Sequence, residues 1–470
     1  MKRHISLIAL LTALILTGCS DYLDETPKGT LIPKTVNDFG MMLDDATFGS
    51  LSYIALGQNE TLLMGDEIQI TPNKQAEYSA WGIAGYKWDD YLFGSNEDDR
   101  DYNGFYHAIY ICNYIIANVG DAKEGTQFTR QFVEGSARFT RAYAYLTLVN
   151  MYARQYDAAT ALTDPGVALV LDADPNQSPT RATVQEVYDQ IIDDATRAET
   201  LLESPEQDYT FRPGKIGACG LLARIYLYME DYAKCQEYAR KARLLSHEPF
   251  DYNQLSVTMM NPDLGITGWP GFYIYGYQYP DVVVYKAEGN WPMLYQDFNL
   301  SDEMAALYEA TDLRLQIFLT TYGRFGFIPG VESLRVAGYY NPSNKGINIG
   351  EIYLMNAEAA ARTGNIDEAL ECLNILGRKR HKAGTYEDVT ERDTTKLLQL
   401  ILDERRRELF LCGQRLFDLK RLNKDPRFAK TITHVLDGQT YTLNPDDPHY
   451  VLPIPLNVID RNPNMEQNPR

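Results

Sequence analysis

The sequence lacks the residue patterns on which common enzyme sites are built. Its six histidines form no HExxH motif and no pair with metal-ligand spacing, and it contains neither a P-loop nor a G-x-S-x-G elbow. No CxxC pair is present either. We therefore predict no catalytic residue, no bound metal and no cofactor.

One segment begins like a calcium-binding loop but does not continue as one. Asp99, Asp101 and Asn103, followed by Gly104, have the spacing that opens an EF-hand. The twelfth position of that loop needs a bidentate glutamate, and here it is Tyr110. We expect this segment to be the start of a helix with acidic residues in its first turn.

Basic residues are few relative to acidic ones. Lys and Arg number 44 against 64 Asp and Glu, a formal net charge of −20. This balance argues against nucleic acid and anionic membrane surfaces as partners. Glycine- or serine-rich linkers are also absent, and a chain of 470 residues that is 45% hydrophobic has ample material for a core. We predict one globule over residues 37–470, with an N-terminal part to about 215 and a C-terminal part from about 216.

The first twenty residues contain a short apolar run. Lys2 and Arg3 precede an apolar run of twelve residues, Ile5–Leu16, which is too short to span a bilayer as a permanent helix. The sequence L-T-G-C that ends at Cys19 resembles a bacterial lipobox, which implies cleavage before Cys19 and its acylation. A plain secretory signal is the alternative, but it requires no cysteine at this place. We predict a signal peptide over residues 1–18 and a lipid-anchored tether over 19–36.

Five cysteines remain after the one in the lipobox, so at least one must be unpaired within the chain. All five lie in helix-like segments beside apolar neighbours, where a free cysteine is usually a small buried hydrophobic residue. They are Cys112, Cys219, Cys235, Cys372 and Cys412.

Helical periodicity dominates the chain. Residues 105–119 and 132–156 predict one helical hairpin, and Thr183 with Glu186 forms a capping-box pattern before another helix. The stretches beginning at Ala218 and Ile352 resemble each other, and each predicts a helix, a tight turn and a returning helix. Small residues at matched positions, Ala223 and Ala357, suit the tetratricopeptide type of hairpin.

The middle of the chain, residues 248–340, has a different composition. It is rich in Gly, Pro, Trp and Tyr, and tyrosines alternate from Tyr273 to Tyr279 with the period of a strand. The prolines of the C-terminal LPIPLNVIDRNPN exclude regular helix and central strand there. The predicted fold class is mainly α, with tetratricopeptide-like hairpins packed against an irregular, loop-rich half that has a few short strands.

Residues 395–421 predict one long helix with a buried charge. Arg405 lies on an apolar stripe with Leu398, Leu402 and Leu409. A buried guanidinium needs a carboxylate partner, because it cannot lose its proton. The candidate partners are Glu351 and Glu358, which share one face of a predicted helix. In the alternative interpretation Arg405 is solvated and pairs with Glu408 on its own helix.

Aromatic clusters lie outside the periodic helices. Flat rings stack on the apolar faces of sugars, while neighbouring amides, acids and arginines bind the hydroxyls. With 34 tyrosines in the chain, many rings must instead be ordinary core residues. The predicted ligand-binding residues are Trp81, Trp88, Tyr91, Asn96, Asp98, Arg100, Trp269, Tyr277 and Trp291.

Several motifs together resemble the SusD/RagB family of outer-membrane nutrient-binding lipoproteins. They are the lipobox with DYLDETPKG, the RAYAY helix of residues 141–145, the helix that begins GEIYLMNAEA at residue 350, the ILDERRREL–CGQRLFDLKR segment, and the P-I-P tail. Two positions depart from the family pattern: Asn348 stands where an arginine is frequent, and Cys412 where an acid commonly precedes the glycine. These departures put local ion pairs in doubt, but not the fold.

The resemblance implies a function and a partner. It implies a lipid-anchored protein on the outer face of the outer membrane that binds oligosaccharides, or peptides, for a SusC-type TonB-dependent transporter. It also implies that the chain is not an enzyme, and that the lipid is its only attachment to the membrane. Two alternatives stay open: a glycoside hydrolase with two carboxylates on loops, and a tetratricopeptide scaffold that binds only protein.

Overall fold

A computed structural model describes residues 33–44, 60–71, 75–76, 78–174, 176–204, 206–254, 279–286, 299–317, 319–320, 335–336 and 344–470. This part of the chain is mainly helical. None of the helices in these ranges is both long and apolar enough to cross a membrane. The longer helices are α4 (Arg100–Asn118), α5 (Arg130–Tyr152), α6 (Val184–Leu201), α7 (Lys215–Tyr228), α8 (Tyr232–Leu245), α12 (Ile349–Arg362), α13 (Ile366–Arg380) and α14 (Thr394–Glu408).

Short helices and strands make up the rest of the regular structure. The short helices are α2 (Val36–Asp44), α3 (Ala80–Lys87), α10 (Asp302–Ala306), α11 (Arg314–Ile317), α15 (Arg415–Leu422) and α16 (Leu456–Arg461). A four-stranded sheet has the order β1 (Ile68–Gln69), β5 (Asn299–Leu300), β7 (Arg335–Val336), β6 (Leu319–Thr320). Three antiparallel pairs are β2 (Pro165–Ala168) with β3 (Arg181–Thr183), β4 (Val282–Val284) with β8 (Ile347–Asn348), and β9 (Ile432–Leu436) with β10 (Gln439–Leu443).

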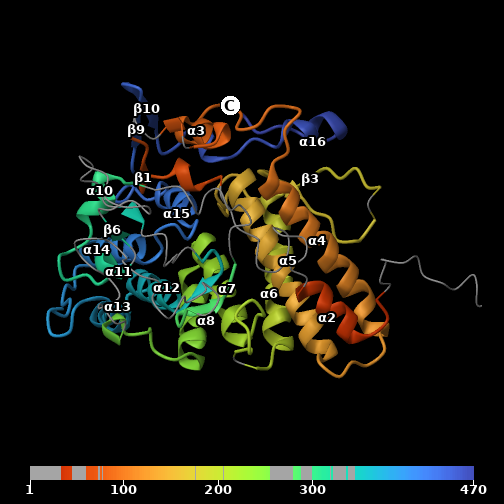
Figure 1. The fold of residues 1–470 in the computed structure, drawn as a ribbon, viewed down its shortest axis with the longest axis horizontal. Coiled ribbons are helices and arrows are strands. Elements are labelled where there is room, and N and C mark those ends of the chain that lie inside the picture. The colour runs from red at the N-terminus through yellow and green to blue at the C-terminus, as the bar shows by residue number, and fades with distance from the viewer. Residues whose placement is uncertain are drawn as a thin grey trace, which may run out of the picture.

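The long helices pack against one another largely in chain order. Each of α4 to α7 contacts the helix that follows it, and α8 then packs against α12, which also contacts α13 and α14. Figure 1 shows this row of helices running from α4 and α5 on one side of the molecule to α13 and α14 on the other. The predicted mainly helical architecture with few short strands is confirmed.

The predicted hairpins are present. The segments beginning at Ala218 and Ile352 lie in the pairs α7–α8 and α12–α13. Ala223 and Ala357 are fully buried, which lets neighbouring helices approach closely. The turn between α12 and α13 contains Gly364 at φ 86°, a conformation that glycine adopts without strain.

Side-chain caps set where several helices begin. Asp99 accepts a hydrogen bond from the backbone N–H of Tyr102 and starts α4. Thr129 likewise caps α5, and Thr183 with Glu186 forms the predicted capping box of α6. The expected helix start at the EF-hand-like sequence is therefore confirmed.

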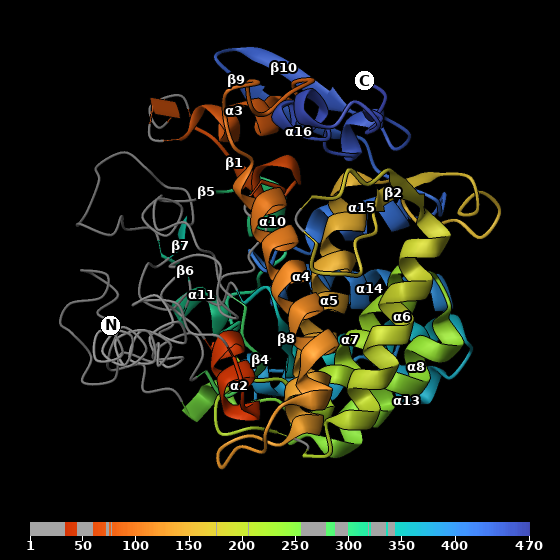
Figure 2. The same cartoon turned by 90° about the vertical axis from the view of Figure 1, so that its right-hand side faces the viewer.

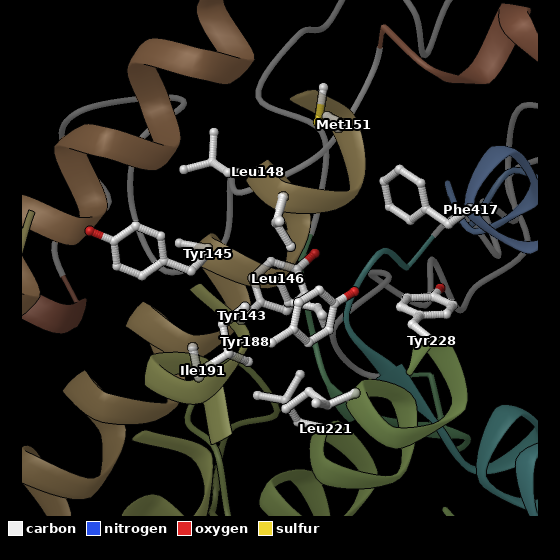
Figure 3. Packing of buried hydrophobic residues seen from close by; sticks show 14 of the residues in the cluster. Tyr143, Tyr145, Leu146, Leu148, Met151, Tyr188, Ile191, Leu221, Tyr228 and Phe417 are labelled. Carbon is white, nitrogen blue, oxygen red and sulfur yellow. The ribbon is translucent and has the colours of Figure 1, made fainter. Parts of the chain in front are cut away.

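The core between the helices is rich in tyrosine. Figure 3 shows Tyr143, Tyr145 and Tyr188 among aliphatic side chains such as Leu146 and Leu221. Buried phenols need hydrogen-bond partners, and the hydroxyl of Tyr145 donates to the carbonyl of Val170 at 2.7 Å.

The cysteines of the described residues are all buried, as expected for small hydrophobic side chains, and Cys112, Cys219, Cys235 and Cys372 are free. Burial raises the pKa of the Cys412 thiol to about 12 and that of Cys372 to about 11. Such thiols are unreactive near neutral pH.

The prediction of one long helix over residues 395–421 is wrong. The helix breaks after Glu408 and resumes at Arg415, so the segment consists of α14 and α15. The break is made by Leu411 at φ 60° and Gly413 at φ 74°, and a left-handed residue cannot continue a right-handed helix. The apolar stripe is buried in both helices all the same.

One end of the helical row is covered by a loop-rich layer, which consists of α3, the β9–β10 hairpin, α16 and the loops that join them. Figures 1 and 2 both place these elements along the top of the molecule, beyond the upper ends of the long helices. In the hairpin, His434 pairs with Tyr441 across the strands. Asp437 and Gly438 both have positive φ, as in the type I′ turn that suits tight hairpins.

Candidate functional site in the loop-rich layer

The described part of the predicted ligand segment is a short helix followed by a loop. Ser79 accepts a hydrogen bond from the N–H of Gly82 at 3.2 Å and starts α3. The helix ends at Trp88, whose left-handed backbone, with φ 56°, turns the chain away. Residues 89–99, the site loop, then lead to α4.

Trp88 belongs to the core rather than to an open surface. Its side chain is only 6% exposed, and its indole N–H donates to the carbonyl of Met64 at 3.1 Å. Its ring stacks on that of His434 with centroids 4.2 Å apart, and Tyr86 stacks on His434 at 4.0 Å. Because the Trp88 side chain is buried and hydrogen-bonded within the core, we do not retain this residue in the proposed site.

Among the predicted aromatic residues that the structure describes, Trp81 and Tyr91 keep accessible surface. Trp81 is half-buried, and its ring centroid lies 6.2 Å from that of Phe93 in the site loop. Tyr91 is 43% exposed, so its ring is open to solvent. These rings could offer flat faces to a ligand.

The predicted hydroxyl-binding residues Asn96, Asp98 and Arg100 are exposed at the end of the site loop and the start of α4. Asp98 already accepts a hydrogen bond from the amide of Asn457 at 2.8 Å. Asn96 lies two residues before Asp98 in the site loop, and Arg100 lies two residues after it at the start of α4.

A small pocket lies between the site loop and the chain that follows β10. We call residues 447–457 the tail segment. One wall is Tyr91–Phe93, the other is Leu452–Leu456, and Glu60 and Asp99 also line it. The pocket has room for about one water molecule. Figure 1 shows the C-terminus between α3, which precedes the site loop, and α16, in which the tail segment ends.

The two carboxyl groups that line this pocket, those of Glu60 and Asp99, are in contact with buried polar neighbours. Tyr152 donates to Asp99 at 2.6 Å and lies 3.3 Å from Glu60. Burial raises the pKa of Glu60 well above its usual value, and the negative charges of Asp99 and Asp101 raise it further. Burial likewise raises the pKa of Asp99. Two carboxyl groups in hydrogen-bonding contact favour a shared proton.

This pair does not have the geometry of a glycosidase. Retaining enzymes hold their two carboxyl groups about 5 Å apart and inverting enzymes further, with the scissile bond between them. Glu60 and Asp99 hydrogen-bond to each other directly, so no sugar can sit between them.

Arg405 is buried, but its main partner is one that the sequence did not indicate. Its side chain is 2% exposed, and Nε donates to Asp418 at 2.7 Å. Glu351 lies 3.7 Å from Nη2, an ion pair without a hydrogen bond. Glu408, the partner in the solvated alternative, instead binds Arg314 and Arg380.

The roles of the two predicted acids therefore need correction. Glu351 makes its close pair with Arg224 at 2.6 Å, and Glu358 pairs with Arg421 at 2.5 Å and with Arg362 at 3.0 Å. On a continuous helix Asp418 would lie about 20 Å from Arg405, at 1.5 Å for each of thirteen residues. The break between α14 and α15 brings them together.

Four predicted residues lie outside the described residues. They are the lipidation residue Cys19 and the ligand residues Trp269, Tyr277 and Trp291. Sequence reasoning in turn missed Glu60 and the tail segment, because they are far from the site loop in the chain and carry no local motif. The clusters of His, Cys, Asp and Glu in the described ranges include none placed to hold a metal ion.

Comparison with known proteins supplies the family. A profile named SusD-like, described as starch-binding associating with outer membrane, matches residues 21–227, and the SusD family profile matches residues 332–470. Together they span most of the chain. The chain belongs to the SusD/RagB family. SusD-like protein P2 of Formosa agariphila is 26% identical over 530 residues, which cover 100% of this chain and 99% of that protein. SusD-like protein P38 of the same organism is 24% identical and covers 80% of each chain.

Solved SusD-like structures share the fold. A SusD superfamily protein from Bacteroides vulgatus has a TM-score of 0.71 at 22% identity, covering 93% of this chain and 99% of its own. A putative sugar binding protein from the same species has a TM-score of 0.70 at 21% identity, covering 94% and 99%. At these identities the likeness establishes the SusD fold and leaves the ligand open.

Proposed function

We propose that this SusD-family chain is a lipoprotein of the outer membrane surface that binds nutrient oligosaccharides and delivers them to a SusC-type TonB-dependent transporter. The observation that carries the proposal is the pair of family matches, which cover both the N-terminal and the C-terminal part of the chain. A structural relative is described as a putative sugar binding protein, which supports the choice of ligand class.

The proposed ligand surface is the exposed side of the site loop. Tyr91 and the accessible face of Trp81 would stack on sugar rings, with Asn96, Asp98 and Arg100 as hydroxyl partners. Trp269, Tyr277 and Trp291 remain predicted members of the same site. In support, the long helices bury their apolar faces against one another. The exposed aromatic rings of the loops are therefore the ones that remain available to a ligand.

The test is a glycan array with the purified mature protein, run beside product analysis of the same glycans and a binding screen with peptides. We expect retention of particular oligosaccharides without cleavage. Released products would make the chain a hydrolase instead. Peptide binding without glycan binding would mean that the ligand is a peptide rather than an oligosaccharide. Binding of folded proteins alone would favour a tetratricopeptide scaffold.

A further inference from the structure

Two hydrogen-bonded contacts fasten the site loop to the tail segment. At one end of the loop, the amide of Asn457 donates to Asp98 Oδ1 at 2.8 Å and to the carbonyl of Glu97 at 3.2 Å. At the other end, His449 Nε2 lies 3.0 Å from Asp90 Oδ1. The pocket lies between these contacts, because its walls, Tyr91–Phe93 and Leu452–Leu456, follow Asp90 and His449 in the chain.

The two contacts differ in chemistry. The imidazole of His449 can gain or lose an N–H donor, whereas the amide of Asn457 always has the same two. His449 Nδ1 lies 2.7 Å from Asp447 Oδ1, while Nε2 faces Asp90. An ionised carboxylate only accepts hydrogen bonds, and a neutral imidazole has a single N–H. Both contacts can therefore be hydrogen bonds only when His449 carries two protons and a positive charge. Loss of one proton removes one of them, and it also removes the attraction between the ring and the two carboxylates.

When His449 loses a proton, we expect its contact with Asp90 to break and its contact with Asp447 to remain. Asp447 is two residues from His449 in the same segment and also accepts from its backbone N–H at 3.0 Å, so this local pair survives in the neutral ring. Asp90 belongs to the other side of the pocket and is 64% exposed. A neutral His449 that keeps its proton on Nδ1 leaves the site loop without this tie.

We propose that His449 is a pH-sensitive clasp: protonated, it holds the site loop against the tail segment and keeps the pocket narrow, and on losing its proton it frees the loop at Asp90. The proposal rests on the proposed function only in taking this loop as part of the ligand site. The narrow pocket, with room for about one water molecule, is then the clasped state.

The other charged groups around the site loop either become more negative as the pH rises or keep their charge across the neutral range. Glu60 and Asp99, which line the pocket, repel each other once both are ionised, and Asp101 adds to that charge. Arg470 is near enough for its charge to act on Asp90, and it stays protonated across the neutral range. Lys87 pairs with Asp89 at 2.8 Å, and Asn457 does not titrate.

The test is hydrogen exchange of the ligand-free mature protein at about pH 5.5 and about pH 8, the range over which histidine side chains in general change charge, with rates corrected for intrinsic exchange. Wild type is compared with His449→Gln, which cannot gain the charge. Asn457→Ala removes the contact that does not titrate. His247→Gln is the matched control, because His247 is exposed after α8 and its ring lies within hydrogen-bond distance of the carbonyl of its neighbour Glu248.

We expect protection of residues 91–98 in the wild type to fall about three- to fivefold at the higher pH, the range of a largely exposed ion pair. In His449→Gln it should be low at both pH values, and in His247→Gln it should match the wild type. Asn457→Ala should lower protection but keep the pH difference. Equal protection of the wild-type loop at both pH values, or an unchanged pH difference in His449→Gln, would overturn the clasp. Because no ligand is present, either result leaves the proposed function untouched.

Discussion

At the scale of single residues, Arg405 illustrates how a charge is kept inside this protein. Its guanidinium is held by Asp418 at 2.7 Å and lies near Glu351. Removing one side of a buried pair costs about 3–5 kcal/mol, because the other charge stays buried without compensation. We expect Arg405→Ala to lower the free energy of unfolding by about that amount in denaturant titrations, toward the lower end because Asp418 keeps its contact with Arg421 at 2.8 Å.

A surface pair provides the control. Arg392 is 66% exposed and pairs with Asp367, which is 85% exposed. Arg392→Ala should change the same free energy by less than about 1 kcal/mol. If the two variants lost equal stability, the interpretation of Arg405 as a buried, partnered charge would have to be abandoned.

Glu404 makes the stability of the folded protein depend on pH in the acid range. Burial by itself raises the pKa of this carboxyl, but Arg314 at 2.8 Å and Arg407 at 2.6 Å outweigh it and lower the pKa to about 2. The unfolded chain, with a pKa near 4.5, binds more protons between these values. The stabilisation is thus complete above about pH 4.5 and is lost as the pH falls toward 2, by about 3 kcal/mol in total.

The measurement is the free energy of unfolding of wild type and Glu404→Gln across that acid range. Glu404→Gln should be less stable at neutral pH, and the difference between the two proteins should shrink as the pH falls. A difference that stays constant with pH would mean that this carboxyl has no depressed pKa in the folded state.

At the scale of elements, the break between α14 and α15 positions several charged side chains. It depends on Gly413 at φ 74°, a conformation that costs other residues about 1–2 kcal/mol. We therefore expect Gly413→Ala to destabilise the protein by that amount in thermal or denaturant unfolding. The control is Gly120→Ala, where an added Cβ meets nothing within 4 Å and the backbone has no positive φ. Equal effects would show that the break needs no glycine.

The helices themselves could be predicted from the sequence because helical periodicity and caps are local. The hairpins α7–α8 and α12–α13 and the capping box at Thr183 follow from residues within one or two turns of each other. The break at Gly413 could not be predicted, because the apolar residues keep their helical spacing across it. A single glycine in a helical pattern is tolerated at a cost of about 1 kcal/mol, so it does not by itself mark the end of a helix.

The candidate site was only partly predictable for a related reason. The segment from Trp81 to Arg100 was found from its composition, but composition does not tell which ring faces inward. Trp88 is turned into the core by its left-handed backbone and by stacking on His434, which lies far away in the chain. Glu60 and His449 meet the site loop only through the tertiary fold, so no local pattern marks them.

At the scale of the whole molecule, the proposed function requires attachment at Cys19. The chain has no other long apolar run in its sequence, and several acyl chains together hold a protein firmly at a membrane. We expect Cys19→Ala to leave washed outer-membrane fractions and to appear in soluble fractions, in cells that lack the partner transporter. Cells that retain the variant in the membrane would contradict lipid anchoring as the sole attachment.

The central claim is that the site loop binds an oligosaccharide, and two tyrosines of similar exposure allow a direct test. Tyr91 in the site loop is 43% exposed, and Tyr110 on α4 is 41% exposed. The measurement is calorimetric titration of wild type, Tyr91→Ala and Tyr110→Ala with the oligosaccharide best retained on the array, with thermal melts alongside. A stacking ring is worth about 1–3 kcal/mol. The account predicts that Tyr91→Ala weakens binding about tenfold or more at an unchanged melting temperature, while Tyr110→Ala binds like the wild type. Equal affinities of the three proteins would contradict it.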